Sequence, residues 1–486
     1  MEHERHMPVV CPTRLSRFAS IFRDRPSLSN DEITPEQRQR SMRIALASGV
    51  FSSIANKGMM GAALVGFARA LGATPFWIGL LAAANGISLI GQPLGSYLLS
   101  RSSSRKGLFM RTAYIGRFAL FALVGAALFL PPGAATVFLI FGVVIMRKFA
   151  DALGSPSWMS WMTDLPTEHE RGWFWSTRNM IVNIASMTAA VGLNWYLGSD
   201  PSMTKFAVYF AIVGVAGVLD IFFHRGVNGI RVAAENSREN PVRMFRRPFR
   251  DRAYGPVLLF HLLFSFGTGI GVSMLHLMLL EEIHLSYFEI GIFFSGIIGI
   301  MNVLASRVWG RLIDNLKEGP RLVLIICATA SAIIPLIWPF VGPRDFVLIT
   351  VNVILVGVFQ SGNIISRMAV ISAYSPQEHR PTYASMNVLV MAVGSMLGAL
   401  LAGTLAEIFV GFSASWGPII FTPLRSLFIL SSGVRIMALF VLPFIREPES
   451  LPIGVYVRQV FALNPFHHDT WVYVREKVRK NGNGDG

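Results

Sequence analysis

The sequence predicts an all-α membrane protein with twelve transmembrane helices in two pseudo-symmetric six-helix bundles. The 486 residues are 52% hydrophobic and only 15% charged, whereas soluble domains have about 25% charged residues. The apolar residues form runs of about twenty or more, which is long enough to cross roughly 30 Å of hydrocarbon. Landmarks of the first half also recur in the second half. The first two observations exclude a soluble enzyme, and the third indicates two related halves.

Twelve apolar segments are expected to span the membrane. They are residues 44–70, 76–99, 109–131, 134–157, 172–197, 205–224, 256–280, 287–308, 321–341, 345–373, 384–411 and 418–444. The predicted organisation is an N-terminal tail (1–42), a first six-helix bundle (43–224), a basic linker (225–255), a second six-helix bundle (256–445) and a basic C-terminal tail (446–486). No inserted soluble domain fits between these segments.

The distribution of basic residues predicts the orientation. Only three of the 43 Lys and Arg residues, Arg69, Lys205 and Arg344, fall in the expected outer loops. Cytoplasmic loops carry the excess of Lys and Arg in membrane proteins, so both termini are expected in the cytoplasm and the protein in the inner (cytoplasmic) membrane. The net charge of +15 then indicates anionic lipid as a partner at the cytoplasmic face, and nucleic acid is not expected.

An internal repeat relates the two halves. Residues 76–79 (Phe-Trp-Ile-Gly) enter the second segment, and residues 288–291 (Phe-Glu-Ile-Gly) enter the eighth, 212 positions later. The fifth segment starts near Arg171 and Ser176. The eleventh segment starts near Arg380 and Ser385, which lie 209 positions later in the chain. Matches at two topologically equivalent places indicate a repeat.

Residues between the eighth and ninth segments carry a family resemblance. Gly310, Arg311 and Asp314, followed by Lys317 and a further basic residue, are similar to the Gly-x-x-x-Asp loop signature of the major facilitator superfamily of secondary transporters, which the chain resembles over residues 43–446. The first-half copy, residues 95–107, lacks the Asp. The resemblance implies two bundles that alternate access to a central cavity, with coupling to a proton or counter-solute.

The resemblance also implies a cytoplasmic gate. Gly310, Arg311 and Asp314 would form a latch when the inner side is closed, with Arg380 as a partner of Asp314 and Arg171 at the equivalent place in the first half. An Asp at a helix end holds a nearby cation or a helix N-terminus. A solvated loop is the alternative.

Lys57 is the clearest charge within a predicted span. It lies about halfway along the first segment, beside Asn56, and an ionised group at this depth costs about 3 kcal/mol. It is therefore expected to face a wet cavity, as a solute or coupling site with Asn56, or to form a structural ion pair.

Arg147 and Asp151 form a second charged pair of candidates, in the fourth segment. They are four residues apart on one helix face and could neutralise each other. Arg147 loosely resembles the family's helix-4 Arg, and Asp151 is the best candidate for carrying a coupling proton. Arg117, in the third segment, is a further candidate.

Gln360, Asn363 and Arg367 recur at spacings of three and four in the tenth segment. Residues at these spacings share one helix face, so they form a polar stripe. The stripe is expected to face water in a cavity, although hydrogen bonds between helices are the alternative.

Two small-residue pairs are expected to allow close helix packing. They are Gly91 with Gly95, and Gly394 with Gly398. The pairs would lie either at the seam between the halves or in ordinary contacts within one half.

The balance of charge within the spans points to the solute. Eight basic residues lie within the predicted spans, against two clear carboxylates, Asp151 and Asp220. A cavity with this excess favours an anionic or strongly polar small molecule. The predicted function is therefore secondary active transport of such a solute by a protein that functions as a monomer. The alternatives are a transport-inactive receptor or assembly scaffold of the same fold, and a proton-coupled drug exporter.

No ATP-binding loop and no metal-binding motif is present in the sequence. Accordingly, neither a cofactor nor a metal is expected, and the chain is not expected to be an enzyme.

Overall fold

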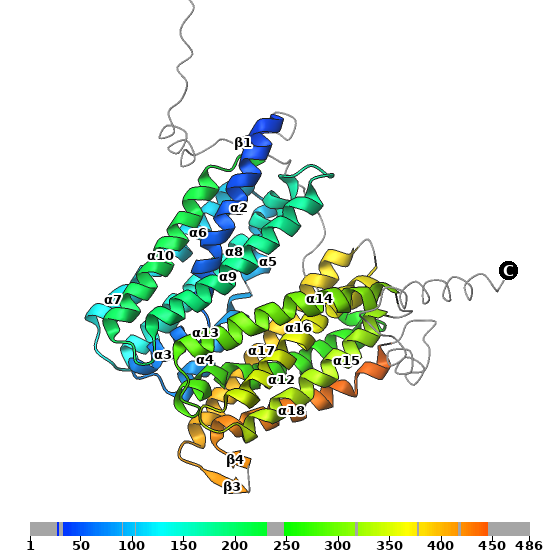
Figure 1. Ribbon diagram of the computed structural model, residues 1–486. Coiled ribbons are helices and arrows are strands. Elements are labelled where there is room, and N and C mark those ends of the chain that lie inside the picture. The colour runs from blue at the N-terminus through cyan, green and yellow to red at the C-terminus, as the bar shows by residue number, and fades with distance from the viewer. Residues whose placement is uncertain are drawn as a thin grey trace, which may run out of the picture.

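The structure is a computed structural model that describes residues 27–28, 33–89, 91–102, 104–230, 247–315, 319–376, 379–416 and 419–445. The predicted C-terminal tail, nearly all of the N-terminal segment before residue 33, and half of the basic linker lie outside these residues. The described residues are almost entirely helical (Figure 1), which confirms the predicted fold class.

The first half holds nine helices among its described residues. They are α2 (Pro35–Lys57), α3 (Ala62–Ala70), α4 (Pro75–Leu89), α5 (Gly91–Ser100), α6 (Arg105–Phe118), α7 (Phe121–Phe129), α8 (Ala134–Asp164), α9 (Arg171–Leu197) and α10 (Met203–Arg225). A short parallel pair, β1 (Ser27–Leu28) with β2 (Gly229–Ile230), joins its two ends.

The second half repeats this pattern. Its helices are α12 (Gly255–Glu281), α13 (Tyr287–Gly291), the π-helix η2 (Ile292–Ile297), α14 (Ile298–Asn315), α15 (Gly319–Ile333), the 3-10 helix η3 (Ile334–Phe340), α16 (Phe346–Tyr374), α17 (Arg380–Ile408), α18 (Pro423–Leu439) and the 3-10 helix η5 (Leu442–Phe444). An antiparallel pair, β3 (Ala414–Trp416) with β4 (Ile419–Phe421), was not predicted and lies in the loop between α17 and α18.

Ten helical segments of the described residues are long and apolar enough to cross a membrane. The first passage (α2 with α3) and the fourth (α8) are not among them, and α8 carries Arg147, Lys148 and Asp151. Both nevertheless pack within the first bundle. That these two polar passages also cross the membrane, which would give twelve spans, remains a prediction.

The first passage begins earlier than predicted and is broken near its middle. A capping box, in which the Thr34 hydroxyl accepts from the backbone N–H of Gln37 and the Gln37 side chain accepts from that of Thr34, starts α2 at Pro35 rather than at residue 44. The helix stops at Lys57, and Gly61 has a φ of +82°, a conformation that glycine adopts without steric cost. Lys57 therefore lies at a helix break.

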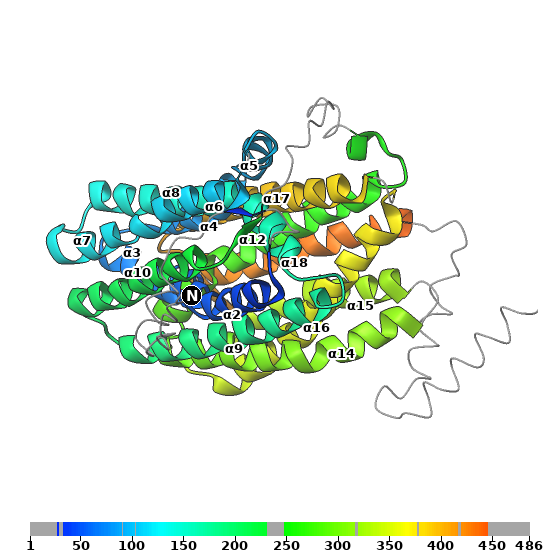
Figure 2. The same ribbon diagram turned by 90° about the horizontal axis from the view of Figure 1, so that it is seen from above.

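The two halves meet at one face of the molecule and diverge toward the other (Figure 1). We call the side where α2 and α12 begin the linker face, and the opposite side the far face. One hydrophobic core on the far-face side contains residues of both halves, such as Leu71 and Tyr287. Toward the linker face, each half has a separate core. Figure 2 shows the molecule from above, with helices of the first half overlapping those of the second half.

Glycines bring the halves together at the seam between α4 and α17. A Cβ added to Gly79 would lie 2.7 Å from the carbonyl oxygen of Ala399 and from the Cα of Gly403. The predicted glycine pairs lie elsewhere, because Gly95 packs on Leu153 of α8 and Gly398 on Phe266 of α12. These pairs make contacts within each half.

Candidate functional site

A central cavity of about 700 Å³ lies between the two halves. The first half contributes the α2–α3 break and parts of α9 and α10, and the second half contributes α12, η2, η3, α16 and α18. Cavities of this size between helix bundles hold drug-sized or smaller ligands. The cavity is therefore the candidate binding site.

Three cations line the cavity, and no Asp or Glu is among the described residues that line it. Lys57 comes from α2, Arg367 from α16 and Arg435 from α18. Neither Lys57 nor Arg367 forms an ion pair with a described residue. Lys57 thus faces a cavity rather than a structural ion pair, one of the two environments that the sequence predicts.

The polar stripe of α16 also faces the cavity, as predicted. Gln360, Asn363 and Arg367 are all lining residues. The Asn363 amide also donates to the Ser331 hydroxyl at 2.7 Å and to the Cys327 carbonyl at 3.1 Å on α15. The stripe serves both as a cavity wall and as a contact between helices.

His261 of α12 is a lining residue that sequence reasoning missed. Its Nδ1 lies 2.7 Å from Asn387 Oδ1, and since the amide oxygen only accepts, Nδ1 carries the hydrogen. The side chain is 3% exposed and its Nε2 has no hydrogen-bond partner. A histidine in an apolar span was the available signal, as it was for His276, which lines the same cavity.

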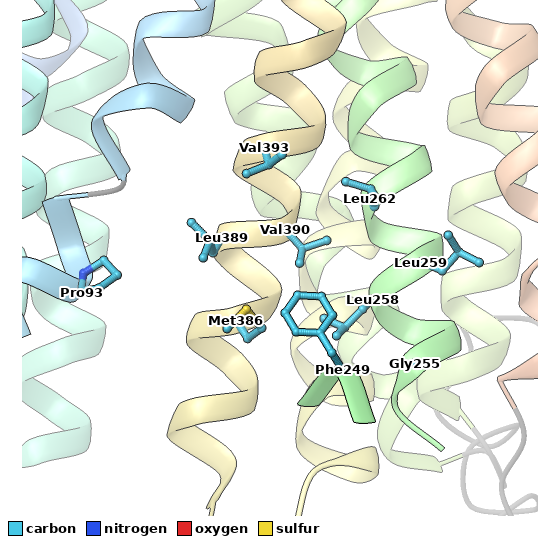
Figure 3. Close-up of a pocket in the computed structure, with 10 residues that line it drawn as sticks. All are labelled: Pro93, Phe249, Gly255, Leu258, Leu259, Leu262, Met386, Leu389, Val390 and Val393. Atoms are coloured by element: carbon cyan, nitrogen blue, oxygen red, sulfur yellow. The ribbon is translucent and has the colours of Figure 1, made fainter. Parts of the chain in front are cut away.

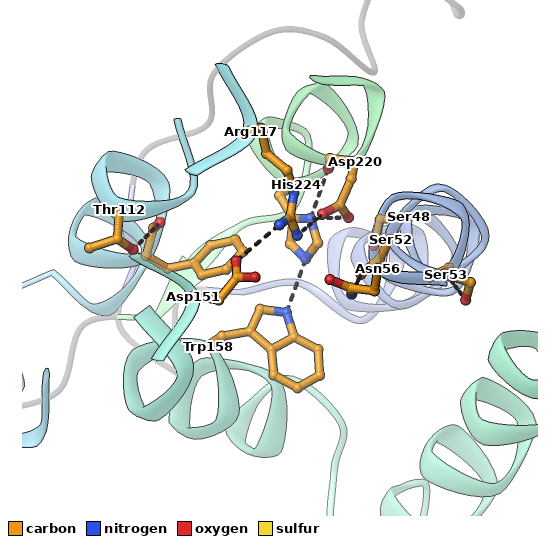
Figure 4. Close-up of polar contacts among 12 residues, drawn as sticks. Ser48, Ser52, Ser53, Asn56, Thr112, Arg117, Asp151, Trp158, Asp220 and His224 are labelled. Carbon is orange, nitrogen blue, oxygen red and sulfur yellow. Dashed lines mark hydrogen bonds and ion pairs between the residues drawn. The ribbon is translucent and has the colours of Figure 1, made fainter. Parts of the chain in front are cut away.

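A polar network within the first half contains Arg117, Asp151 and Asn56 (Figure 4). Arg147 also belongs to it, and all four residues lie outside the cavity lining. Arg117 donates to Asp151 Oδ1 at 2.9 Å, and Arg147 forms an ion pair with the other oxygen of the same carboxylate. Arg147 also donates to Asn56 Oδ1 at 3.0 Å. The predicted local pair of Arg147 and Asp151 is present, and Asn56 joins it to the helix that carries Lys57.

The network extends to residues that the sequence did not single out as partners. The second contact of Arg117 is Asp220 of α10 at 3.0 Å, and His224 Nδ1 lies 3.2 Å from Asp220 Oδ1. The indole N–H of Trp158 donates to His224 Nε2 at 3.1 Å (Figure 4). Two guanidinium groups thereby contact two carboxylates.

The predicted gate residues lie at the linker face. Gly310, Arg311 and Asp314 are in the last turns of α14, and Arg171 and Arg380 begin α9 and α17. The four charged side chains are exposed, and no ion pair joins Asp314 to Arg380 or Arg171 among the described residues. A Cβ on Gly310 would meet nothing within 4 Å. The latch remains a prediction for a state in which the linker face is closed.

The far face is held closed by contacts between the halves. Arg69 of α3 forms an ion pair with Glu281 of α12 at 2.5 Å. The backbone N–H of Phe76 donates to Glu407 at 3.2 Å, and that of Tyr287 donates to the Gly198 carbonyl at 3.0 Å. Toward the linker face the halves have separate cores, whereas the contacts described here join them at the far face.

A second cavity, of about 800 Å³, lies between Pro93 near the start of α5 and helices α12 and α17. Every residue that lines it is apolar, from Pro93 on one side to Leu262 and Val393 on the other (Figure 3). The cavity arises because α4 packs on α17, whereas α5 packs on α8. It holds no polar group that could orient a solute.

No group of three potential metal ligands occurs among the residues that the structure describes.

Residues 46–308 and 257–475 each match the sequence model of the Major Facilitator Superfamily. A search of curated proteins gives no match. Among solved structures, the chain is similar to a mutant of the nucleoside transporter NupG (TM-score 0.65, 15% identity, 84% of this chain and 100% of that chain). A peptide transporter POT gives a TM-score of 0.64 at 14% identity, over 86% of this chain and 99% of that chain. A bacterial homolog of the human lysosomal transporter Spinster, in an inward-facing and unoccupied conformation, gives a TM-score of 0.58 at 14% identity, over 85% of this chain and 95% of that chain. At these identities the likeness concerns the fold.

Proposed function

Because the chain belongs to the Major Facilitator Superfamily, we propose that it is a secondary active transporter that moves a small polar or anionic solute by alternating access. The observation that carries the solute class is the charge of the central cavity. Lys57, Arg367 and Arg435 line it without a carboxylate among the described lining residues. Cations desolvated in a cavity attract anions and repel other cations.

Two of these cations are available to a ligand. Lys57 and Arg367 have no ion-pair partner among the described residues, and an unpaired charge in a membrane protein is costly unless it faces water or a ligand. An anionic solute would supply the missing ion-pair partner of both side chains. This reasoning favours transport over a scaffold, which gains nothing from such a cavity.

The drug-exporter alternative fits the cavity less well. Export of lipophilic cations calls for a largely apolar cavity with a carboxylate that attracts the cation. The described lining residues offer the opposite charge. We therefore retain the anionic or polar solute as the proposed cargo.

Alternating access accounts for the arrangement of the two halves. The cavity opens to the linker face, which we place in the cytoplasm, while the far face is closed. Closing the linker face would bring the last turn of α14 toward α9 of the first half, where Asp314 could pair with Arg171. Arg380 belongs to the same half as Asp314 and could pair with it through a change within that half. Asp151 remains our candidate for coupling, because its side chain is 38% exposed whereas Asp220 is 1% exposed.

The test is a binding screen on purified protein in nanodiscs. Anionic, neutral and cationic metabolites are compared for thermal stabilisation, since a ligand at 100 times its Kd stabilises by about 2.7 kcal/mol. We expect an anion to stabilise the native protein, with affinity reduced roughly 10- to 100-fold in Lys57→Gln or Arg367→Gln through loss of a charged hydrogen bond. Lys205→Gln, at the start of α10 and outside the cavity, is the matched control.

Stabilisation by cations alone would contradict the proposed cargo. Absence of any response, with all variants well folded, would favour the scaffold.

A further inference from the structure

The two ends of the central cavity differ in chemistry. The depth of a lining residue in the cavity follows from its position along its helix, because α12 starts at the linker face and α18 starts at the far face. The far end is lined by the aromatic side chains of Phe294, Trp338 and Phe428 and by the His276 imidazole, whose ring centroid lies 6.2 Å from that of Phe294. Phe260 and Phe264 line the end nearer the linker face. The cationic and imidazole side chains that line the end nearer the linker face are those of His261, Arg367 and Arg435.

The far end is a packed aromatic floor. The Trp338 ring stacks on Phe294 with centroids 6.3 Å apart, and it lies 5.7 Å from Phe428. Trp338 is close to the end of η3, and Phe428 is in the second turn of α18. These three rings offer apolar contact to a ligand.

The opposite end offers unsatisfied polar groups. Arg435 donates to the Ser331 carbonyl at 2.7 Å, but its Nε has no partner among the described residues. His261 Nε2 is also without a partner, although the side chain is almost fully buried. Unpartnered buried polar atoms are rare in native proteins, and a bound polar ligand is one way to satisfy them.

The distance between the two ends sets the length of a ligand that contacts both. Phe428 and Arg435 are seven residues apart on α18, which corresponds to roughly 10 Å along a helix axis. A ligand that contacts both ends has an anionic group at one end and an apolar body of about one ring or a short chain at the other.

We propose that the cavity selects amphipathic organic monoanions, with the anionic group held by Arg367 and Arg435 and the apolar body on the floor of Phe294, Trp338 and Phe428. This inference rests on the proposed function, because it assumes that the solute is an anion. It adds that small, fully polar anions bind weakly. Zwitterions and cations bind weakly too, because the described lining residues provide no carboxylate for an ammonium group.

A chain-length series tests the inference directly. Binding of acetate, butyrate, hexanoate and phenylacetate to the full chain in nanodiscs is measured by calorimetry, with empty nanodiscs as the control for partition into lipid. Each buried methylene is expected to tighten binding about fourfold until the chain fills roughly 10 Å. Hexylammonium, which has the same apolar body and the opposite charge, is expected not to bind.

Two adjacent phenylalanines provide a matched pair of variants. Phe294 lines the cavity, whereas Phe293 stacks on Phe346 outside it, and both are half-buried. Phe294→Leu is expected to weaken the binding of hexanoate and phenylacetate at least threefold and to leave the binding of acetate unchanged. Phe293→Leu is expected to leave the binding of all three unchanged. Arg367→Gln is expected to weaken every carboxylate by the same factor, whereas Arg307→Gln, outside the cavity, is expected to have no effect.

The outcomes separate this inference from the proposed function. Equal affinity for acetate and phenylacetate, both lost in Arg367→Gln, would overturn the aromatic floor while supporting an anion transporter. Equal effects of Phe294→Leu and Phe293→Leu would also overturn it. Binding of hexylammonium in place of the carboxylates would overturn both.

Discussion

The buried pair of Arg117 and Asp220 gives a prediction about stability that follows from charge balance. Arg117 and Asp220 are 4% and 1% exposed. In the network around them, Arg117 contacts both Asp220 and Asp151 (Figure 4), and Arg147 contacts Asp151. Asp220→Asn leaves one uncompensated positive charge in this buried cluster. Removing one partner of a buried pair costs about 3–5 kcal/mol, and we expect a loss of unfolding free energy in that range.

The double variant tests the origin of this loss. Arg117→Gln alone leaves Asp220 without its guanidinium partner, and a similar cost is expected. In Arg117→Gln with Asp220→Asn, the remaining Arg147 and Asp151 again balance each other. The double variant is therefore expected to lose at least about 2 kcal/mol less than the sum of the two single losses, which is within the range of coupling between contacting residues.

The assay is SDS titration in mixed micelles followed by tryptophan fluorescence, to which Trp158 contributes from within the network. Asp164→Asn is the control for the same chemical change in a more exposed pair, with Arg105, and we expect it to cost at most about 1 kcal/mol. A loss for Asp220→Asn no larger than this control would refute the reasoning. So would additivity of the double variant to within roughly 0.5 kcal/mol.

Two further predictions concern close contacts at glycines. In Gly66→Ala, the added Cβ would lie 1.7 Å from the Tyr287 hydroxyl, so we expect a destabilisation of about 1–3 kcal/mol in thermal unfolding, which Tyr287→Phe partly restores; an unchanged melting temperature would contradict this. Gly79→Ala places a methyl group against the backbone of Ala399 and Gly403 at the seam and is expected to shift the population away from the state closed at the far face. Distances between spin labels across that face report the shift, and Gly142→Ala, whose Cβ meets nothing within 4 Å, should behave as the native protein.

Patterns local in the sequence predicted a large part of this protein. Apolar runs and the recurrence of residues 76–79 at 288–291 predicted the helical bundles and their repeat. The cost of burying a charge in lipid pointed to Lys57, and the helical period pointed to the stripe that contains Arg367; both face the cavity. The pair of Arg147 and Asp151 also followed from spacing, because residues four apart lie on one helix face.

Contacts between distant segments were not predictable in the same way. Arg117 and Asp220 are 103 positions apart, and their pairing depends on how α6 packs against α10. His261 and Arg435 reach the same cavity from α12 and α18. A serine four positions from each, Ser265 and Ser431, was the available signal of a polar face. Asn56 was grouped with Lys57, but it turns toward Arg147.

The sequence by itself therefore determined that this chain is a two-part helical membrane protein, because hydropathy and charge act on each segment independently of the others. It also identified several groups that could not face lipid. Only the tertiary structure decided which of those groups neutralise one another within the first half and which remain unpaired in the cavity. That division depends on helix packing and on the face at which the halves close, and both are set by contacts between segments far apart in the chain.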